Sequence, residues 1–257
     1  MNGGAAVHAA ILAAGLSSRF GGLQKALHRL GGRTLLERSV EQLLAADVAS
    51  VTVVTGHRQE DVSEALRTRG LDAEVRMLHN DHYAEWNNFY SVELVCDRLP
   101  GTDVLVVNGD VIYARDALRK VLDATGCDMY LAVSDGEVDE EAMKVAVQGQ
   151  RVVALGKSIA ASRAAGEFIG ISRLGAAARR WYSSLSRWGR TRGMTSHYYE
   201  DVYDGLCGNL VALRCGVDTA DWAEIDEAAD LARAQAVADR VDSPPSTSPR
   251  RADAPPE

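Results

Sequence analysis

The sequence has few cysteines, and those it has follow no regular spacing. Its 257 residues include Cys96, Cys127, Cys207 and Cys215, none of them in a C-x-x-C pair. This argues against a disulfide framework or a zinc cluster and favours free, mostly buried thiols in a reducing compartment. No apolar run approaches the roughly 18 residues of a membrane-spanning helix, and the N-terminus lacks the features of a signal peptide. We therefore expect a cytoplasmic protein with no membrane partner.

Positive charge is also scarce. The chain has 28 Lys and Arg against 36 Asp and Glu, which gives a net charge of −8. A dedicated nucleic-acid binder needs basic surface for phosphate backbones, so no nucleic-acid partner is expected. The length is that of one domain, or of one domain with a small appendage. Function must therefore be sought in local motifs.

The stretch from Ala9 to Leu27 has the pattern of a strand followed by an anion-binding turn. An apolar run is followed by small residues that let backbone N–H groups approach a polyphosphate, and by Arg19 and Lys25, which add positive charge. The candidate phosphate-loop residues are Leu12, Ala13, Ala14, Gly15, Ser17, Arg19 and Lys25. The spacing fits neither a Walker A loop nor a G-x-G-x-x-G loop. A plain glycine-rich loop with two solvated charges is the alternative.

Strands and helices alternate through the first half of the chain. The apolar or β-branched segments are 7–12, 50–55, 73–78, 102–108 and 128–133, and helical patterns cover 34–46, 59–69 and a segment from about 114. Strands without polar alternation are buried on both faces, as in parallel sheets. This alternation predicts a parallel sheet with right-handed crossovers. Farther on, 143–147 and 151–155 predict a hairpin, followed by a strand at 166–174 and helices at 176–188 and 227–237.

One carboxylate stands out at the end of a predicted strand. The segment TDVLVVN leads directly into Gly109 and Asp110. Ligands of open parallel sheets sit at the carboxyl ends of strands, so Asp110 is predicted to bind Mg²⁺ near a bound phosphate. A helix cap for the segment near Ala114 is the alternative.

Three polar clusters each allow two interpretations. Asn87 and Asn88 precede a predicted helix, where one of them can cap it or read the edge of a base. His79 and His82, with Asp81 between them, suggest a metal pair, but no third ligand is evident and a surface loop is favoured. The cluster Tyr198, Tyr199, Glu200, Asp201 and Tyr203 has the aromatic faces and carboxylates that a cationic amine needs. A core-facing aromatic helix explains the tyrosines equally well.

These segments together resemble the nucleotidyltransferases that make nucleotide sugars and related activated alcohols. The first loop is similar to L-A-A-G-x-G/S-x-R-(spacer)-P-K, with Ser17 where glycine is usual, Gln24 where proline is usual, and a short spacer. The segment Asn87-Asn88-Phe89-Tyr90-Ser91 looks like N-N-x-Y-S of the branch that activates phosphocholine and phosphonates with CTP. Other matching segments are Glu140–Val145, Gly156-Lys157, Gly166–Ile171, Tyr198–Asp201 and Trp222–Asp226.

The resemblance implies a Rossmann-like three-layer α/β/α fold, with a mostly parallel central sheet and a small acceptor-binding β-hairpin and helical insertion. One domain would cover residues 1–239, with a nucleotide half at about 1–135 and an acceptor half at about 136–239. Residues 240–257, rich in proline and polar residues, are predicted to be disordered.

The implied activity is Mg²⁺-dependent transfer of a cytidylyl group from CTP to a small phosphate or phosphonate, with release of pyrophosphate. The acceptor would be phosphocholine or a 2-aminoethyl- or 2-hydroxyethylphosphonate. A phosphate dianion is already nucleophilic, so no general base is required. A sugar- or inositol-phosphate nucleotidyltransferase and a non-catalytic nucleotide-binding regulator are the alternatives, and a homodimer is compatible with all three.

The resemblance also assigns roles to individual residues. The catalytic cations would be Arg19, Lys25, Lys144 and Lys157. The nucleotide would contact Leu12, Ala13, Ala14, Gly15, Ser17, Asn80, Asn88, Ser91 and Gly109. The acceptor would contact Asn87, Glu167, Tyr199, Glu200 and Asp201. Asp110 and Asp226 would hold the metal, with Glu224 as a nearby partner of the second carboxylate.

Overall fold

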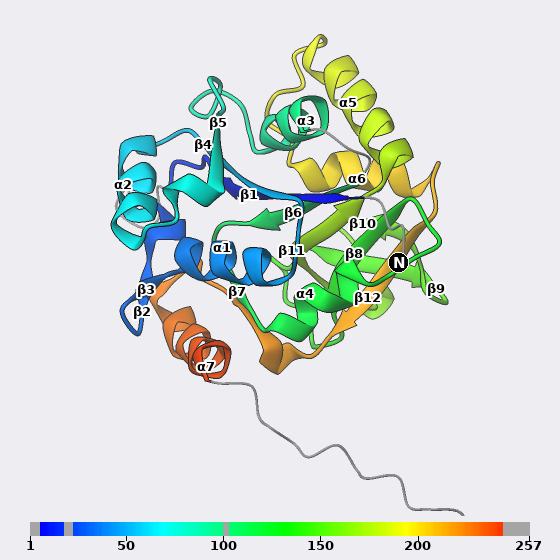
Figure 1. Ribbon diagram of the computed structural model, residues 1–257. Helices are drawn as coiled ribbons and strands as arrows, with labels where there is room; N and C mark the ends of the chain where they lie inside the picture. The colour runs from blue at the N-terminus through cyan, green and yellow to red at the C-terminus, as the bar shows by residue number, and fades with distance from the viewer. Residues whose placement is uncertain (1–5, 18–22, 100–102, 244–257) are drawn as a thin grey trace, which may run out of the picture.

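The computed structural model describes residues 6–17, 23–99 and 103–243, and its centre is a nine-stranded sheet (Figure 1). In spatial order the strands are β5 (Val75–His79), β4 (Ser50–Thr55), β1 (Val7–Ala13), β6 (Asp103–Asn108), β11 (Gly166–Leu174), β8 (Met129–Ser134), β12 (Ala212–Val217), β10 (Arg151–Leu155) and β9 (Lys144–Gln148). A separate small hairpin joins β2 (Arg29–Leu30) to β3 (Arg33–Thr34).

The sheet is parallel except around β11 and the β9–β10 hairpin. Strands β5, β4, β1 and β6 pair in parallel, as do β8 and β12. Strand β11 runs antiparallel to β6 and β8 and also pairs with the start of β9. The carboxyl ends of β1 and β6 therefore meet at one edge of the sheet, where ligands of such folds bind. The prediction of a mostly parallel α/β sheet is confirmed.

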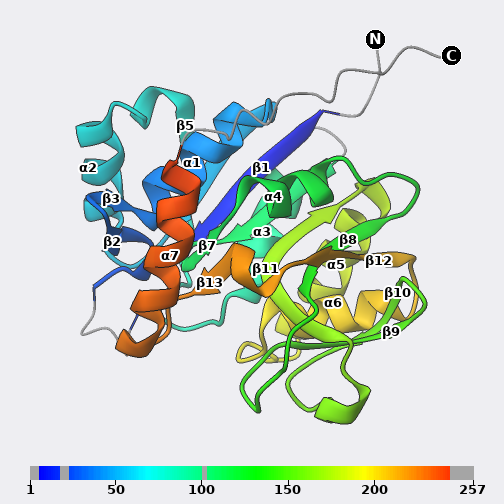
Figure 2. The same cartoon turned by 90° about the horizontal axis from the view of Figure 1, so that it is seen from below.

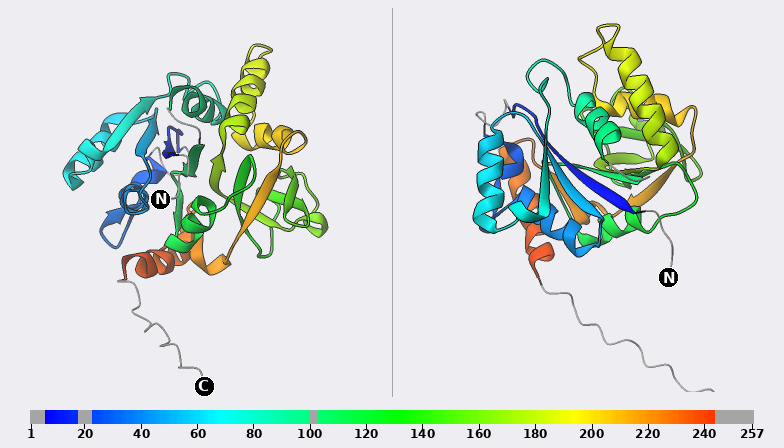
Figure 3. Two further views of the ribbon diagram at one scale, coloured as in Figure 1. Left: turned by 45° about the vertical axis from the view of Figure 1, so that its right-hand side comes forward. Right: turned by 45° about the horizontal axis from the view of Figure 1, so that its top comes forward.

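Helices cover both faces of the sheet (Figures 1 and 3). One face carries α3 (Phe89–Arg98), α5 (Ala176–Arg190) and α6 (Tyr199–Cys207), and the other carries α1 (Leu35–Ala45), α2 (Gln59–Arg69) and α4 (Arg115–Leu122). Each face has its own apolar core. A capping box starts α1: Glu37 N donates to Thr34 Oγ1 at 3.0 Å, and Thr34 N donates to the Glu37 carboxylate at 3.1 Å.

A third small core joins the end of the chain to its middle. Strand β13 (Trp222–Glu224) pairs antiparallel with β7 (Val111–Tyr113), and α7 (Leu231–Asp242) packs against both (Figure 2). The N–H of Ile225 donates to the carbonyl of Asp110 at 3.0 Å. This pairing brings the segment after β13 beside the end of β6.

Two predicted boundaries differ from the structure. The final helix begins at Leu231, after a short 3₁₀ turn, because Asp230 accepts hydrogen bonds from the N–H groups of Asp226 and Glu227. It continues to Asp242, whose carboxylate binds Arg38 at 2.8 Å, so residues 240–242 are helical and not part of a disordered tail. Residues 244–257 lie outside the described part of the chain. None of the described helices is long and apolar enough to cross a membrane.

Candidate active site

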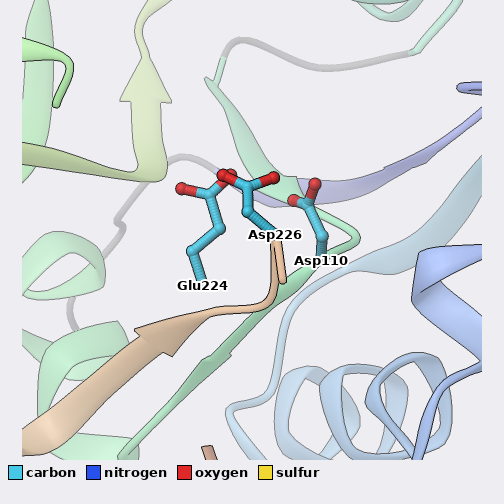
Figure 4. A group of neighbouring side chains, drawn as sticks. All are labelled: Asp110, Glu224 and Asp226. Carbon is cyan, nitrogen blue, oxygen red and sulfur yellow. The ribbon is translucent and has the colours of Figure 1, made fainter. Parts of the chain in front are cut away.

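Three carboxylates meet at the carboxyl edge of the sheet. Asp110 follows β6, Glu224 ends β13 and Asp226 comes two residues later; one oxygen of each lies within 4.8 Å of the others (Figure 4). Among the residues that the structure describes, they are the only group of His, Cys, Asp or Glu side chains close enough together to hold an ion. The predicted pairing of Asp110 with Asp226 is present. Glu224, which was expected only as a neighbour, is the third member of this carboxylate trio.

Lys25 lies between two members of the trio. Its Nζ is 3.3 Å from Asp110 Oδ2 and also donates to the carboxylate of Asp226. Burial alone would lower the pKa of the Lys25 ammonium, but the two carboxylates outweigh burial and raise that pKa. The short spacer before Lys25 therefore does not keep it from the acids. Arg19, the other predicted cation of this loop, lies outside the described residues.

The trio carries more negative charge than Lys25 can neutralise. Burial, followed by the charges of Asp110 and Asp226, raises the pKa of Glu224 well above its usual value. Burial also raises the pKa of Asp110, which Lys25 opposes and Asp226 reinforces. Three oxygen ligands with one neutralising ammonium form a donor set that suits a hard divalent cation. The residues present thus fit the predicted Mg²⁺.

A cavity of about 560 Å³ adjoins the trio and contains most of the predicted nucleotide contacts. Predicted residues that line it are Leu12, Ala13, Ala14, Gly15, Ser17, Lys25, Asn80, Asn87, Asn88, Ser91, Gly109 and Asp110. Gly109 is required sterically, because a Cβ there would lie 2.4 Å from the carbonyl oxygen of Leu12. The first loop, the end of β6 and the start of α3 thus form one surface around this cavity.

The asparagines of this cavity do not cap α3. Asn88 stands at the N-cap position, but its Oδ1 accepts from the N–H of Tyr199 at 2.9 Å and makes no capping bond. Asn87 donates from Nδ2 to the carbonyl of Ser196 at 2.9 Å. The capping prediction is therefore wrong: the two amides connect the start of α3 to the start of α6. Buried Asn80 donates to Ser91 Oγ at 2.9 Å and fixes the segment before α3.

Gln24, which stands where the resembled motif has proline, organises the first loop. Its buried Nε2 lies 2.7, 3.1 and 3.0 Å from the carbonyl oxygens of Ala13, Gly15 and His57. Its Oε1 accepts from Ser17 Oγ at 3.2 Å, and that hydroxyl accepts from the N–H of Lys25 at 3.1 Å. One carboxamide thus holds the loop against the end of β4 and orients the backbone that carries Lys25. The sequence marked Gln24 only as a departure from a motif.

Replacing Gln24 is expected to loosen this loop. The Gln24→Ala variant leaves buried carbonyl oxygens without their donor, so we expect a loss of about 1–3 kcal/mol in the free energy of unfolding. Gln24→Pro should lose less, because Gln24 has φ −61°, which proline adopts without strain. Urea denaturation measures both, with Gln235→Ala on the surface of α7 as the matched control. Equal stabilities for Gln24→Ala and the control would contradict this role.

Lys144 does not fit its predicted role as a phosphate contact. Its side chain is buried, and Nζ lies 2.8, 3.4 and 3.0 Å from the carbonyl oxygens of Glu140, Ala142 and Lys157. An ammonium has three N–H donors, and in Lys144 all three are taken up by backbone carbonyl oxygens. Lys144 is therefore a structural residue that holds the Lys157 loop. Lys157 itself is exposed, pairs with Glu141 at 2.9 Å and lies 6.0 Å from the ring of Tyr198, so it is free to change partners.

The tyrosine and acid cluster divides between core and surface. Tyr199 and Tyr203 are fully buried, and their hydroxyls bond Asn108 Oδ1 at 2.9 Å and Ser172 Oγ at 2.8 Å. Asp201 accepts from the N–H of Tyr198 at 2.7 Å and so caps α6. Buried Tyr199 is therefore not a direct acceptor contact, and that prediction is wrong, whereas the role of exposed Asp201 stays a prediction. Helical spacing places Tyr199 and Tyr203 on the inner face of α6, so these two tyrosines do not form a cage for a cationic amine.

Glu200 is a buried acid with one unpartnered oxygen. Its side chain is 6% exposed, and Oε2 has no hydrogen-bond partner among the described residues. It does not line the large cavity, so the structure does not support its prediction as an acceptor contact. Burial raises the pKa of Glu200 to about 8, so the folded protein holds this carboxyl protonated at neutral pH.

The protonated state of Glu200 predicts a pH-dependent stability. In the unfolded chain this acid loses its proton near pH 4.5, whereas the folded protein keeps it until about pH 8. Its contribution is thus present at low pH and declines by up to about 1.4 kcal/mol per pH unit as the pH rises to about 8. Glu200→Gln, which is neutral throughout, should gain stability relative to wild type between pH 5.5 and 8 in urea denaturation. The exposed Glu60→Gln should follow wild type; a Glu200→Gln profile parallel to wild type would contradict the assignment.

The remaining predicted residues lie outside the large cavity. Burial, then the charge of Asp139, raises the pKa of Glu167 to about 7, and this side chain lines a smaller cavity of about 240 Å³. His82 stacks on Trp86 with ring centroids 3.8 Å apart. In the described part of the chain neither His79 nor His82 belongs to a group that could hold an ion.

Comparison with known proteins identifies the family. A family model described as "MobA-like NTP transferase domain" matches residues 9–202, which include the first loop, Asp110 and the start of α6. The chain belongs to the MobA-like NTP transferase family. The prediction of a nucleotidyltransferase is confirmed at this level.

Two individual relatives show which members of the family the chain is similar to. The chain is 36% identical over 159 residues to the "Bifunctional IPC transferase and DIPP synthase" of Rubrobacter xylanophilus, covering 60% of this chain and 35% of the relative. It is 32% identical over 114 residues to the "Choline-phosphate cytidylyltransferase" of Haemophilus influenzae, covering 43% of this chain and 46% of that protein. The chain thus spans less than half the length of these relatives.

Solved structures show the same fold over nearly the whole chain. The inositol-1-phosphate CTP transferase from T. maritima aligns with a TM-score of 0.76 at 23% identity, covering 93% of this chain and 98% of that one. The CTP:phosphocholine cytidylyltransferase LicC from Streptococcus pneumoniae aligns with a TM-score of 0.74 at 24% identity, covering 90% and 99%. The Rossmann-like fold of this NTP transferase is thereby confirmed.

Proposed function

We propose that this NTP transferase transfers the cytidylyl group of CTP to the phosphate of a small phosphorylated alcohol. The observation that carries the proposal is the meeting of Lys25 with the carboxylate trio beside the 560 Å³ cavity. The names of the similar proteins, which include cytidylyltransferases and CTP transferases, support the choice of nucleotide and acceptor.

The proposed reaction joins two anions. An oxygen of the acceptor phosphate forms a bond to the α-phosphorus of CTP, while the bond from that phosphorus to the bridging oxygen breaks. The bond electrons leave with pyrophosphate, and no proton transfer is needed, since a phosphate dianion is nucleophilic at neutral pH. The protein's task is therefore to hold the two groups in line and to offset their repulsion.

The chain's own residues can perform these tasks. The small residues of the first loop present backbone N–H groups to the triphosphate, and the ammonium of Lys25 offsets its charge. Asp110, Glu224 and Asp226 would hold Mg²⁺, which when bound supplies charge stabilisation at the α-phosphate. Exposed Lys157 can exchange Glu141 for the acceptor phosphate.

Pyrophosphate release tests this proposal. The protein is incubated with Mg²⁺ and each of CTP, UTP, dTTP, ATP and GTP, together with inositol 1-phosphate, phosphocholine, 2-aminoethylphosphonate or glucose 1-phosphate. We expect release with CTP and at least one acceptor, and none without an acceptor. Release only with UTP or dTTP and a sugar phosphate would reject the cytidylyl assignment, and binding of CTP without turnover would favour a regulator.

A further inference from the structure

Asn108, the last residue of β6, lines the large cavity and stands two residues before Asp110. Its side chain is only half-buried. Side chains two residues apart in a strand point to the same side of the sheet, so Asn108 shares a side with Val106, which belongs to the core under α3, α5 and α6. A carboxamide, which can both donate and accept hydrogen bonds, thus lies at the base of the cavity near the carboxylate trio.

The oxygen of this carboxamide already has a partner. The hydroxyl of Tyr199 donates to Asn108 Oδ1 at 2.9 Å. Tyr199 is fully buried in α6, and burial raises the pKa of its hydroxyl well above the usual value, so this hydroxyl keeps a hydrogen to donate. Turning the carboxamide over would place an N–H₂ group where the hydroxyl needs an acceptor. Tyr199 therefore determines which end of the carboxamide faces the core.

Gly170 of β11 holds the carboxamide from the other side. It has φ +77°, a conformation that favours glycine, and it lies where the pairing of β11 with β8 is irregular. A Cβ on Gly170 would lie 2.6 Å from Asn108 Nδ2 and 2.7 Å from Asn108 Cγ. Only glycine lets the strand approach the carboxamide this closely, so the orientation of Asn108 is fixed by two separate elements.

The nitrogen of the carboxamide is open to the cavity. No described residue accepts a hydrogen bond from Asn108 Nδ2, and Nδ2 is not among the buried side-chain atoms that lack a partner in the described part of the chain. A nitrogen that has no partner and is not buried is exposed to solvent, here in the cavity that Asn108 lines. Its N–H groups are thus accessible to a ligand, and a phosphate oxygen forms the strongest hydrogen bond with such a donor.

We propose that Asn108 Nδ2 donates to an oxygen of the bound nucleotide beside Asp110, at the α-phosphate or at the 2′-hydroxyl of the ribose, and that Tyr199 is the positioning residue that keeps this donor turned to the cavity. This inference rests on the proposed function. Without the Tyr199 hydroxyl the carboxamide can turn over and present Oδ1. That oxygen would repel a phosphate which already lies near three carboxylates.

Kinetics of Asn108→Ala, Tyr199→Phe and the double variant test the assignment. We expect Asn108→Ala to lower kcat/KM for the nucleotide about 10- to 100-fold, as for the loss of a hydrogen bond to a charged group, and Tyr199→Phe to lower it about 3- to 10-fold. The KM for the acceptor should not change. The double variant should lose no more than Asn108→Ala alone, because Tyr199 acts through Asn108.

Tyr203→Phe is the matched control for the tyrosine variant. It removes a neighbouring hydroxyl of α6 that is also fully buried and lies 2.8 Å from Ser172 Oγ. Both phenylalanine variants should lower the melting temperature to a similar extent, but only Tyr199→Phe should change the kinetics. Equal kinetics in the two variants, or losses that multiply in the double variant, would overturn the positioning role of Tyr199.

Deoxycytidine triphosphate distinguishes the two oxygens that Asn108 can contact. If Nδ2 donates to the α-phosphate, Asn108→Ala loses the same factor with CTP and with dCTP. If Nδ2 donates to the 2′-hydroxyl, the loss is confined to CTP, because dCTP lacks that group in both proteins.

Calorimetric titration with CTP and Mg²⁺, without acceptor, separates this inference from the proposed function. We expect Asn108→Ala and Tyr199→Phe each to bind CTP more weakly than wild type. Weaker binding in both variants, with no pyrophosphate released by wild type, would reject the proposed function and keep the Asn108 assignment. Release by wild type, with kinetics and CTP affinity unchanged in Asn108→Ala, would keep cytidylyl transfer and overturn the assignment.

Discussion

Asp110→Asn and Asp226→Asn are each expected to lower kcat/KM for pyrophosphate release by about 1,000-fold. Each change removes one negative ligand where three carboxylates lie within 4.8 Å, and a lost charge-stabilising contact typically costs about 100- to 1,000-fold. The fold should survive, because fewer like charges remain together: we expect melting temperatures in EDTA equal to wild type or higher. Steady-state assays over a range of Mg²⁺ concentration measure the loss and show how far excess metal restores activity.

The matched control for these variants is Asp218→Asn. Asp218 is exposed and accepts from the N–H of Ala220 at 2.8 Å, a bond that asparagine can also accept. The Asp218→Asn variant should therefore keep full activity. If either trio variant retained more than about a tenth of wild-type activity at limiting Mg²⁺, the metal assignment would be wrong.

Lys25→Met is expected to give the second large effect, a loss of about 100- to 1,000-fold in kcat/KM. Methionine retains much of the length and the apolar stem but removes the ammonium that contacts Asp110 and Asp226. Because those carboxylates lose their only contacting lysine, we also expect the variant to melt at a lower temperature than wild type in EDTA. Added Mg²⁺ should raise the melting temperature of the variant part of the way back to that of wild type, since a ligand that binds only the folded state stabilises it.

Lys120→Met is the matched control for the lysine variant. Lys120 is exposed and donates to the carbonyl of Gly216 at 2.9 Å, away from the trio. It should retain activity and show no Mg²⁺-dependent change in melting beyond that of wild type. A Lys25→Met protein with wild-type kinetics would show that the ammonium serves only to balance charge in the absence of substrate.

The sequence alone predicted the parts of the site that lie at the carboxyl ends of strands. An apolar run that ends in Gly-Asp marks the carboxyl end of β6, and a run that ends in small residues marks the end of β1. In a parallel sheet such ends meet at one edge, so the first loop and Asp110 could be placed together. The pairing with Asp226 came from resemblance to a family, because nothing in local periodicity links β13 to β7.

The sequence could not predict which partner each polar side-chain atom contacts. Lys144 and Lys157 each lie in a segment that resembles the family, yet the three N–H donors of Lys144 are used by backbone carbonyls, whereas Lys157 is exposed. Likewise Tyr199 and Tyr198 are neighbours, but the turn of α6 buries one and exposes the other. Spacing indicates that a residue is near a site, whereas the direction of its side chain depends on packing between distant elements.

The β7–β13 pairing has a consequence for how the protein is made. Asp110 leaves the ribosome long before Asp226. Ile225, whose N–H donates to the carbonyl of Asp110, leaves it immediately before Asp226. Folding during synthesis can complete the nucleotide loop and the first strands early. On the proposed metal assignment, we expect the nascent chain to stay inactive until Asp226 is translated, so that shortened products ending before β13 consume no nucleotide.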